Sequence, residues 1–261
     1  MKIAVLGSGN MGGAIVRGLL AKQVCRNDEI VCTAKTQATL SALSRDFPGI
    51  GVSSNNASAV KNADIILLCV KPWLVEKLVA EIREHVPENA LIASVAAGIS
   101  LEQLEMFFGV TGTRALFRVM PNTAAAYGES MTFISAKNAS EAHSESVRNL
   151  FNAIGKTAFI EEKQMAAGTA IASCGIAFAM RYIRAACEGG VELGLYPEAS
   201  RKFVLQTLRG AVELLEKSGE HPEAAIDRVT TPGGITIRGL NAMEAAGFTA
   251  SVIAGLKAAS N

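Results

Sequence analysis

The chain opens with Met1–Gly13, MKIAVLGSGNMGG, and this stretch decides the predicted fold. An apolar run of strand length, Lys2–Leu6, leads directly into a glycine-rich turn, Gly7–Gly12, and a helical pattern follows at Ala14–Leu20. A strand, a glycine turn and a helix start in this order build an anion site, because the helix N-terminus offers free N–H groups and a partial positive charge. The stretch predicts a dinucleotide-binding turn, although an ordinary βα turn has a similar pattern.

Each of three glycines has a separate role in such a turn. Gly7 permits the tight turn, Gly9 lets the backbone approach a pyrophosphate, and Gly12 lets the helix pack closely against the strand. The strand immediately upstream makes the dinucleotide site the favoured interpretation.

The end of the second predicted strand, Glu29–Thr33, favours a phosphorylated cofactor. NAD enzymes of this architecture place Asp or Glu there to hold the ribose 2′-hydroxyl. This chain instead continues with Ala34-Lys35-Thr36, and an ammonium beside a hydroxyl suits a 2′-phosphate. The expected cofactor is therefore NADPH, with NADH as the alternative. Lys35 can also be read as a solvated charge at the start of the next helix.

Alternation of strands and helices continues to about residue 160. Further strands are predicted at 51–53, 64–70, 91–95, 114–119, 131–135 and 157–160, and helices at 38–45, 57–61, 74–85 and 140–154. The remainder is helical in pattern, at 163–192, 197–217, 222–228 and 239–256. The predicted fold class is α/β, with a Rossmann-type dinucleotide-binding domain at 1–160 and an all-helical domain at 161–261.

The first long helix of the second domain, 163–192, predicts self-association. Its small and apolar residues lie on every side, and a helix that is apolar all round must be covered all round. The remaining helices are too few to cover it within one chain, so we expect a homodimer or a higher homo-oligomer. The uncharged run at 165–180 is short for a bilayer span, which argues against a membrane protein.

Composition excludes other classes. The net charge of the 261 residues is +1 and the basic residues are scattered, which argues against a nucleic-acid surface. The five cysteines form no C-x-x-C pair, which indicates reduced thiols in a cytoplasmic protein. The three histidines lie far apart, so we expect no metal site.

A second candidate site lies in Asp227–Arg238, DRVTTPGGITIR. Thr230 and Thr231 can cap a helix, Pro232 stiffens the turn, and the two glycines that follow leave backbone N–H groups uncovered. Such a nest at a helix start suits a small carboxylate, and a simple capped loop between helices is the alternative.

Five motifs give the chain a resemblance over essentially its whole length. They are Gly7–Met11 (GSGNM), Val70–Pro72 (VKP), Ser94–Gly98 (SVAAG), Arg118–Asn122 (RVMPN) and Val229–Thr236 (VTTPGGIT), the last followed by Gly239-Leu240. With them the chain resembles the pyrroline-5-carboxylate reductase family, and the last motif is the specific one. The resemblance implies a two-domain dimer, with dimers able to join into rings, that reduces 1-pyrroline-5-carboxylate to L-proline with NADPH or NADH.

The resemblance and the local patterns together give the expected site residues. Cofactor contacts are expected from Leu6, Gly7, Ser8, Gly9, Asn10, Met11, Ala34, Lys35, Thr36, Asn56, Val70, Lys71, Pro72, Ala97 and Asn122. Substrate contacts are expected from Glu162, Arg228, Thr231, Gly233, Gly234, Ile235 and Thr236. The Thr236 hydroxyl is the expected catalytic group, as a hydrogen-bond donor and proton relay to the ring nitrogen.

Three departures from the family pattern leave substrate choice open. Ser173–Phe178 reads SCGIAF where the family usually reads GSGPAY, Ile235 replaces a small residue, and Arg228 replaces a frequent Asn. Two other functions therefore remain: another imine reductase or hydroxyacid dehydrogenase of the same plan, or a non-catalytic NADP-binding regulator. Hydroxyacid enzymes usually carry a catalytic lysine on the first interdomain helix, and 165–180 contains no lysine.

Overall fold

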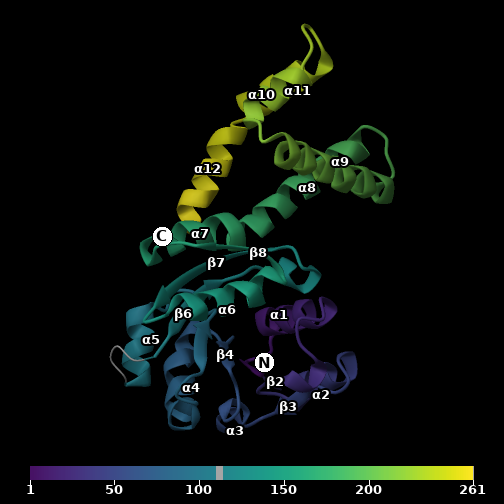
Figure 1. Cartoon of the computed structure of the whole chain (residues 1–261). Helices are drawn as coiled ribbons and strands as arrows, with labels where there is room; N and C mark the ends of the chain where they lie inside the picture. The colour runs from purple at the N-terminus through teal and green to yellow at the C-terminus, as the bar shows by residue number, and fades with distance from the viewer. Residues whose placement is uncertain (110–113, 261) are drawn as a thin grey trace. The chain divides into compact units, whose positions relative to one another are not determined.

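A computed structural model describes residues 1–109 and 114–260. The chain divides into two compact units, Met1–Ser173 and Cys174–Asn261, called the first and second unit below. Figure 1 labels their helices and strands. The last strand ends at Phe159, and the first unit continues into a helix before the boundary. The domain boundary after residue 160 inferred from sequence stays a prediction.

The first unit is built on an eight-stranded sheet of order β3-β2-β1-β4-β5-β6-β7-β8. The strands are β1 Ile3–Leu6, β2 Ile30–Thr33, β3 Gly51–Ser53, β4 Ile65–Leu68, β5 Leu91–Ser94, β6 Leu116–Met120, β7 Ser130–Lys137 and β8 Gly155–Phe159. Strands β1 to β6 run parallel, β7 is antiparallel to β6, and β8 is parallel to β7. The first six strands have the order of a dinucleotide-binding fold. In such folds ligands bind at the point where the strand order reverses, which here lies between β1 and β4. The α/β expectation is confirmed.

Helices cover both faces of this sheet. They are α1 Asn10–Ala21, α2 Gln37–Asp46, α3 Asn56–Val60, α4 Val75–Ile82, α5 Leu101–Phe108 and α6 Glu141–Asn152. Residues of α1, α2 and α6 belong to the hydrophobic cluster on one face, and residues of α3, α4 and α5 to the cluster on the other. Strands covered on both faces read as continuous apolar runs, which is why β1, β4 and β5 were visible in the sequence.

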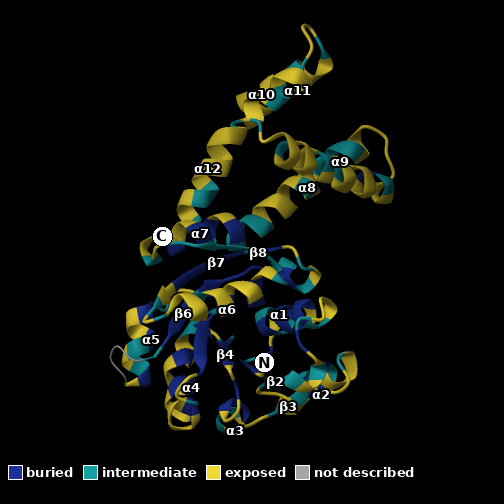
Figure 2. Ribbon diagram, viewed as in Figure 1, coloured by how far each residue is buried: buried dark blue, intermediate teal, exposed yellow. Residues whose placement is uncertain are grey.

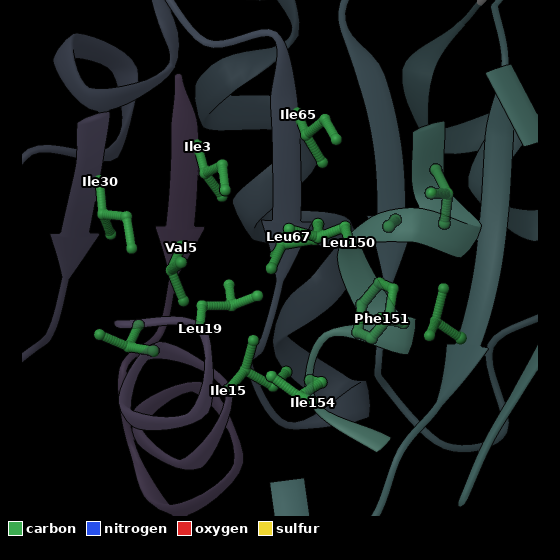
Figure 3. Packing of buried hydrophobic residues seen from close by; sticks show 14 of the residues in the cluster. Ile3, Val5, Ile15, Leu19, Ile30, Ile65, Leu67, Leu150, Phe151 and Ile154 are labelled. Carbon is green, nitrogen blue, oxygen red and sulfur yellow. The ribbon is translucent and has the colours of Figure 1, made fainter. Parts of the chain in front are cut away.

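Figure 3 shows part of the first of these clusters. Ile3 and Val5 of β1 lie near Leu19 of α1, and Phe151 and Ile154 approach from the α6 side. All five side chains are at most 1% exposed. Burial of one such side chain stabilises the fold by roughly 1.5–3 kcal/mol, so this cluster holds α1 firmly on the strand that precedes it.

The second unit has little burial of its own. Its helices are α8 Gly175–Glu192, α9 Pro197–Ser218, α10 Pro222–Arg228, α11 Ile235–Ala245 and α12 Phe248–Ala259. Among the described residues of these helices only Ser200 is buried, and Figure 2 shows their surfaces as exposed or intermediate. Apolar helices in this state leave hydrophobic surface unpaired within one chain.

One expectation about the helices is corrected, and one helix was missed. The single helix predicted at 239–256 is two helices, α11 and α12, because Gly247 between them adopts the left-handed conformation with φ +83°. Helix α5 was not predicted at all, although Ser100 and Gln103 form a capping box at its start.

The predicted helix at 163–192 is present with a change of winding. It begins as a short 3-10 turn, Glu162–Gln164, continues as α7 Met165–Gly168, and becomes π-helical at Thr169–Cys174 before α8. The run Glu162–Glu192 is long and apolar enough, by length and composition, to cross a membrane, a test that core helices of soluble proteins also pass.

We predict opposite effects for two Gly→Ala substitutions in α1. A Cβ at Gly18 would lie 2.1 Å from the Ala125 carbonyl oxygen, whereas a Cβ at Gly13 meets only the Ser8 carbonyl, at 3.8 Å. Gly18→Ala should lower the free energy of unfolding by about 1–3 kcal/mol through overpacking. Gly13→Ala should raise it by about 0.5–1 kcal/mol, because alanine is the better helix former. Thermal unfolding of both variants tests the pair, and equal midpoints would contradict the close packing at Gly18.

Candidate functional site

The glycine turn joins β1 to α1 at the carboxyl edge of the sheet. Gly7 has φ +94°, and its N–H and that of Ser8 donate to the Thr33 carbonyl at 3.2 and 2.8 Å. A Cβ at Gly7 would lie 2.9 Å from the Cys69 carbonyl oxygen, and one at Gly12 would lie 2.5 Å from the Gly7 carbonyl oxygen. Both positions therefore require glycine, as the sequence predicted.

Gly9 differs from these two glycines, because a Cβ there would meet nothing within 4 Å. It is exposed at the N-cap of α1, and among described residues no side chain caps this helix and no acidic residue lies in its first turn. Open space in front of uncapped N–H groups is what a pyrophosphate requires. The turn therefore fits a dinucleotide.

The groups beneath the turn are uncharged. Burial raises the pKa of the Cys32 thiol to about 11, with a hydrogen bond from Ser8 acting in the opposite direction. Burial also raises the pKa of the Cys69 thiol, which lies at the end of β4. Both thiols stay protonated at neutral pH, so neither places a negative charge beside the anion site.

The end of β2 carries the residues expected to read the ribose. Ala34 is half-buried and Lys35 is exposed. Thr36 is the N-cap of α2, and its Oγ1 accepts from the Thr39 N–H at 3.3 Å. The Lys35 ammonium is therefore the charged group that this edge presents next to the strand end.

The other expected cofactor residues lie at neighbouring strand ends. Val70, Lys71 and Pro72 follow β4, with Lys71 exposed at the start of a 3-10 turn. Ala97 follows β5 and is exposed. Asn56 is the first residue of α3, and its Nδ2 donates to the Glu81 carboxylate at 3.1 Å. The structure thus gathers these positions at the carboxyl edge of the parallel strands.

Asn122 follows β6 but its side chain is engaged inside the protein. It is 5% exposed. Its Nδ2 donates to the Ala172 carbonyl at 3.2 Å, and its Oδ1 accepts from the Ala124 N–H at 3.0 Å. These bonds give Asn122 partners other than the predicted cofactor.

Glu162 also has partners within the first unit. Its Oε1 accepts from the Leu101 N–H at 2.7 Å and lies 3.3 Å from Arg118 Nη1. Leu101 is the first residue of α5, so this carboxylate stabilises a helix N-terminus as well as a cation. Sequence reasoning missed Arg118 as its partner, because the two residues are brought together only by the sheet.

The predicted substrate loop lies in the second unit, between α10 and α11. Gly233 has φ +69° and open space where a Cβ would lie. Gly234 is the N-cap of α11, its N–H donates to the Thr231 carbonyl at 3.0 Å, and no side chain caps this helix among the described residues. The expected cap from Thr230 does not form, because its Oγ1 donates to the Ile226 carbonyl at 2.7 Å.

Thr231, Ile235 and Thr236 are exposed around this helix start. No acidic residue lies in the first turn of α11 among the described residues. Exposed amides at an uncapped helix start can hold a small anion.

Arg228 is the last residue of α10 and pairs with a residue that sequence reasoning missed. Its guanidinium forms a two-pronged ion pair with Glu220, with Nη1 2.8 Å from Oε1. The pair links the last residue of α10 to the residue that precedes its N-cap, His221, directly before the loop. A signal was available in the sequence, since an acid precedes this short helix and a base ends it.

Two family models match the chain. The model described as pyrroline-5-carboxylate reductase dimerisation matches residues 162–261, and the model of NADP oxidoreductases, coenzyme F420-dependent, matches residues 2–98.

Curated relatives cover nearly the whole chain. Pyrroline-5-carboxylate reductase 2 of Dictyostelium discoideum is 36% identical over 97% of this chain and 89% of its own length. The Arabidopsis thaliana reductase is 34% identical over 99% of this chain and 92% of its own length. Pyrroline-5-carboxylate reductase 1 of Dictyostelium is 36% identical over 99% of this chain, which spans 48% of that relative.

Solved structures agree. The pyrroline carboxylate reductase of Plasmodium falciparum with NADP bound superposes with a TM-score of 0.89 at 29% identity, covering 100% of this chain and 95% of that one. The Streptococcus pyogenes 1-pyrroline-5-carboxylate reductase gives 0.88 at 29% identity, covering 100% of this chain and 96% of its own. Sequence identity, coverage and fold therefore lead to one conclusion: the chain belongs to the pyrroline-5-carboxylate reductase family of NAD(P)H-dependent oxidoreductases that act on the CH–NH group.

Proposed function

We propose that this chain reduces 1-pyrroline-5-carboxylate to L-proline, with NADPH preferred and NADH as the alternative donor. The observation that carries the proposal is the pair of uncapped helix N-termini, that of α1 after Gly9 and that of α11 after Gly234. The first suits a pyrophosphate and the second a carboxylate. Membership in the family supplies the reaction, and NADP bound to the Plasmodium relative supports the cofactor.

The first unit holds the cofactor in this proposal. The N–H groups of Asn10 and Met11 at the start of α1 bind the pyrophosphate, and Leu6–Gly9 line the turn against it, because the N–H groups of Gly7, Ser8 and Gly9 already donate to backbone carbonyls. Lys35 with Thr36 binds the 2′-phosphate. Ala34, Asn56, Val70, Lys71, Pro72 and Ala97 line the remaining length. When bound, the cofactor supplies a hydride to the imine carbon. The residues of the chain contribute placement, because a cyclic imine is electrophilic already, and more so when protonated.

The second unit orients the substrate. The N–H groups of Gly233 and Ile235 hold its carboxylate, and Thr231 and Gly234, whose N–H donates to the Thr231 carbonyl, line the turn. Arg228 and Glu162 are further expected substrate contacts. The Thr236 hydroxyl hydrogen-bonds the ring nitrogen and relays a proton from water, since a hydroxyl is too weak an acid to be the final source. Ile235 is 81% exposed and occupies the position where a small residue is usual, so it is the side chain best placed to alter ring specificity.

One assay separates this function from its rivals. Oxidation of NADPH is followed with 1-pyrroline-5-carboxylate and with larger cyclic imines, and 2-hydroxyacids are offered with NADP⁺ in the reverse direction. Preference for the five-membered imine supports the proposal. Preference for another substrate identifies another reductase or dehydrogenase, and binding without turnover identifies a regulator.

We further propose that the chain works as a homodimer or higher homo-oligomer in the cytoplasm. The exposed apolar helices of the second unit and the dimerisation model over 162–261 support the assembly. A second copy would cover the apolar surface of α8, so the proposed function needs no membrane. It involves no nucleic acid either, since the basic residues are scattered and the net charge is +1. Five free cysteines are consistent with a reducing compartment.

Removing the ammonium of Lys35 should reveal the cofactor preference. Lys35→Ala should raise the Kd for NADPH about 10-fold or more, because it removes a charge-assisted contact to the 2′-phosphate, and leave that for NADH nearly unchanged. Fluorescence titration measures both constants. Lys61→Ala, another exposed lysine of the same unit, is the matched control. Equal effects of Lys35→Ala on both cofactors would remove the phosphate argument.

Removing the hydroxyl of Thr236 should affect turnover alone. Thr236→Ala should lower kcat/KM for the imine about 100-fold, the range that a positioned proton-transfer group contributes, without changing NADPH affinity. Thr236→Ser keeps the hydroxyl and should retain most of the activity. A Thr236→Ala enzyme with wild-type kcat/KM would show that the proton arrives by another route.

A charge on α8 should dissociate the assembly. Met180 is 60% exposed and lines an apolar groove between α8 and α9, with Ile183 and Val191. Met180→Asp should shift the mass in light scattering toward that of one chain, because it would bury an unpaired carboxylate in the interface. Met106→Asp is the matched control, since Met106 is 67% exposed on α5 in the first unit. An unchanged mass for Met180→Asp would place the interface elsewhere.

A further inference from the structure

The π-helical segment Thr169–Cys174 is tied to the sheet by one side chain. The Ala172 carbonyl accepts from Asn122 Nδ2 at 3.2 Å, fifty residues earlier in the chain. Asn122 is 5% exposed and Ala172 is 7% exposed. π-Helical turns inside longer helices are rare and are frequent at functional sites. The side chain that contacts this turn is therefore a candidate for a functional role.

Asn122 is held rigidly on the sheet side. Its Oδ1 accepts from the Ala124 N–H and its backbone N–H donates to Ser130 Oγ, both at 3.0 Å. Ser130 Oγ lies 3.0 Å from Thr132 Oγ1, which is fully buried. A buried network whose members are satisfied in this way fixes one arrangement, so the Nδ2 donor is aimed at Ala172 before the helix packs.

This donor favours π over α winding. In an α-helix the Ala172 carbonyl accepts from the N–H of Ile176, and in a π-helix the hydrogen bonds shift by one residue. The hydrogen bond from Asn122 Nδ2 replaces the one that the Ala172 carbonyl would accept from Ile176 in an α-helix. Upstream of the segment, α7 packs closely on β7, since a Cβ at Gly168 would lie 2.7 Å from the Phe133 ring.

The winding has a consequence further along the same helix. An α-helix turns by about 100° per residue, so one extra residue in a turn rotates every later side chain by about that angle relative to earlier ones. The segment spans the boundary between the units at 173/174. The winding at 169–174 thus sets the helical register with which α8 begins at Gly175.

Asn122 also connects to the helix of the glycine turn. It is the N-cap of the 3-10 turn Thr123–Tyr127, and Ala125 of that turn packs against Gly18 of α1. The residue that fixes the π segment is therefore anchored to the helix proposed to bind the pyrophosphate.

We propose that Asn122 is a positioning residue that holds the 169–174 segment in its π-helical winding through the Ala172 carbonyl, and that turnover requires this winding whereas cofactor binding does not. The proposal rests on the proposed function for its effect on turnover, and on the hydrogen bonds alone for its effect on winding.

Asn122→Asp tests both parts, because it keeps Oδ1 for Ala124 and replaces the Nδ2 donor by a carboxylate oxygen, which repels the Ala172 carbonyl. Amides of 169–176 should exchange with deuterium about 5- to 10-fold faster, the factor expected from one buried hydrogen bond. The kcat for the imine should fall about 10-fold or more, as small misplacements do, with the Kd for NADPH within about 2-fold of wild type. Ser135→Ala is the matched control: it removes another buried side-chain donor to a backbone carbonyl of the first unit, that of Ile160, outside the Asn122 network, and kcat should stay near wild type.

A second substitution, Ile176→Pro, should restore the π-helical winding in the Asn122→Asp variant. Proline has no N–H, and its ring clashes with the carbonyl four residues earlier in an α-helix, which is that of Ala172. The substitution removes the α-helical alternative, so the double variant Asn122→Asp/Ile176→Pro should recover slow exchange and most of kcat. Proline also stands here in the GSGPAY pattern from which this chain departs. If Ile176→Pro prevents folding, Asn122→Ala with exchange measured at 169–176 replaces the rescue, and wild-type exchange then overturns the proposal.

Other outcomes have defined meanings. Wild-type exchange in Asn122→Asp refutes the effect on winding. Faster exchange with unchanged kcat refutes the need for this winding in turnover. A rise in the Kd for NADPH that matches the loss of kcat/KM shows a direct cofactor contact and also overturns the proposal. If the wild-type enzyme does not reduce 1-pyrroline-5-carboxylate, the proposed function fails, and the exchange measurements still decide whether Asn122 sets the winding.

Discussion

The structure of the first unit depends on a close backbone contact between Gly12 and Gly7, at which any side chain larger than the hydrogen of glycine would clash. Gly12 of α1 approaches the Gly7 carbonyl so closely that a Cβ would lie 2.5 Å from its oxygen, and Gly7 in turn lies against the Cys69 carbonyl. The contact brings the start of α1 to the junction of β1 and β4, the point where the strand order reverses. The open position at Gly9, the packing of α1 on the Thr123–Tyr127 turn and the access to the helix N-terminus all follow from it.

Sequence reasoning succeeded where the signals are local. The glycine turn, the apolar strands and α10, which runs from Pro222 to Arg228 as predicted, are specified by glycine spacing, by continuous apolar runs and by a proline at the first helical position. It failed at Gly247, because a glycine within an apolar periodic pattern does not reveal whether it continues the helix or ends it. Helix α5 was overlooked although its Ser-x-x-Gln capping box is a local signal as well.

The site shows the same division. The motifs located the turn and the loop, but partners distant in sequence were beyond local patterns: Asn122 with Ala172, Glu162 with Arg118 and the Leu101 amide. Such pairs depend on strand order and register, which one sequence does not state. Contacts to cofactor and substrate remain predictions. For the substrate, one reason lies in the second unit. Its loop presents amides from helices with almost no burial of their own, so the completed site depends on what covers them.

The two thiols beneath the glycine turn have one more consequence. Cys32 and Cys69 are deprotonated only far above neutral pH, and thiolates, not thiols, react with alkylating agents and peroxides. The glycine turn therefore lies on a lining that resists oxidative damage as long as β1, β2 and β4 stay paired. Modification of these sulfurs would occur only during an opening of that region, which makes them internal reporters of how often the loop and its strands separate.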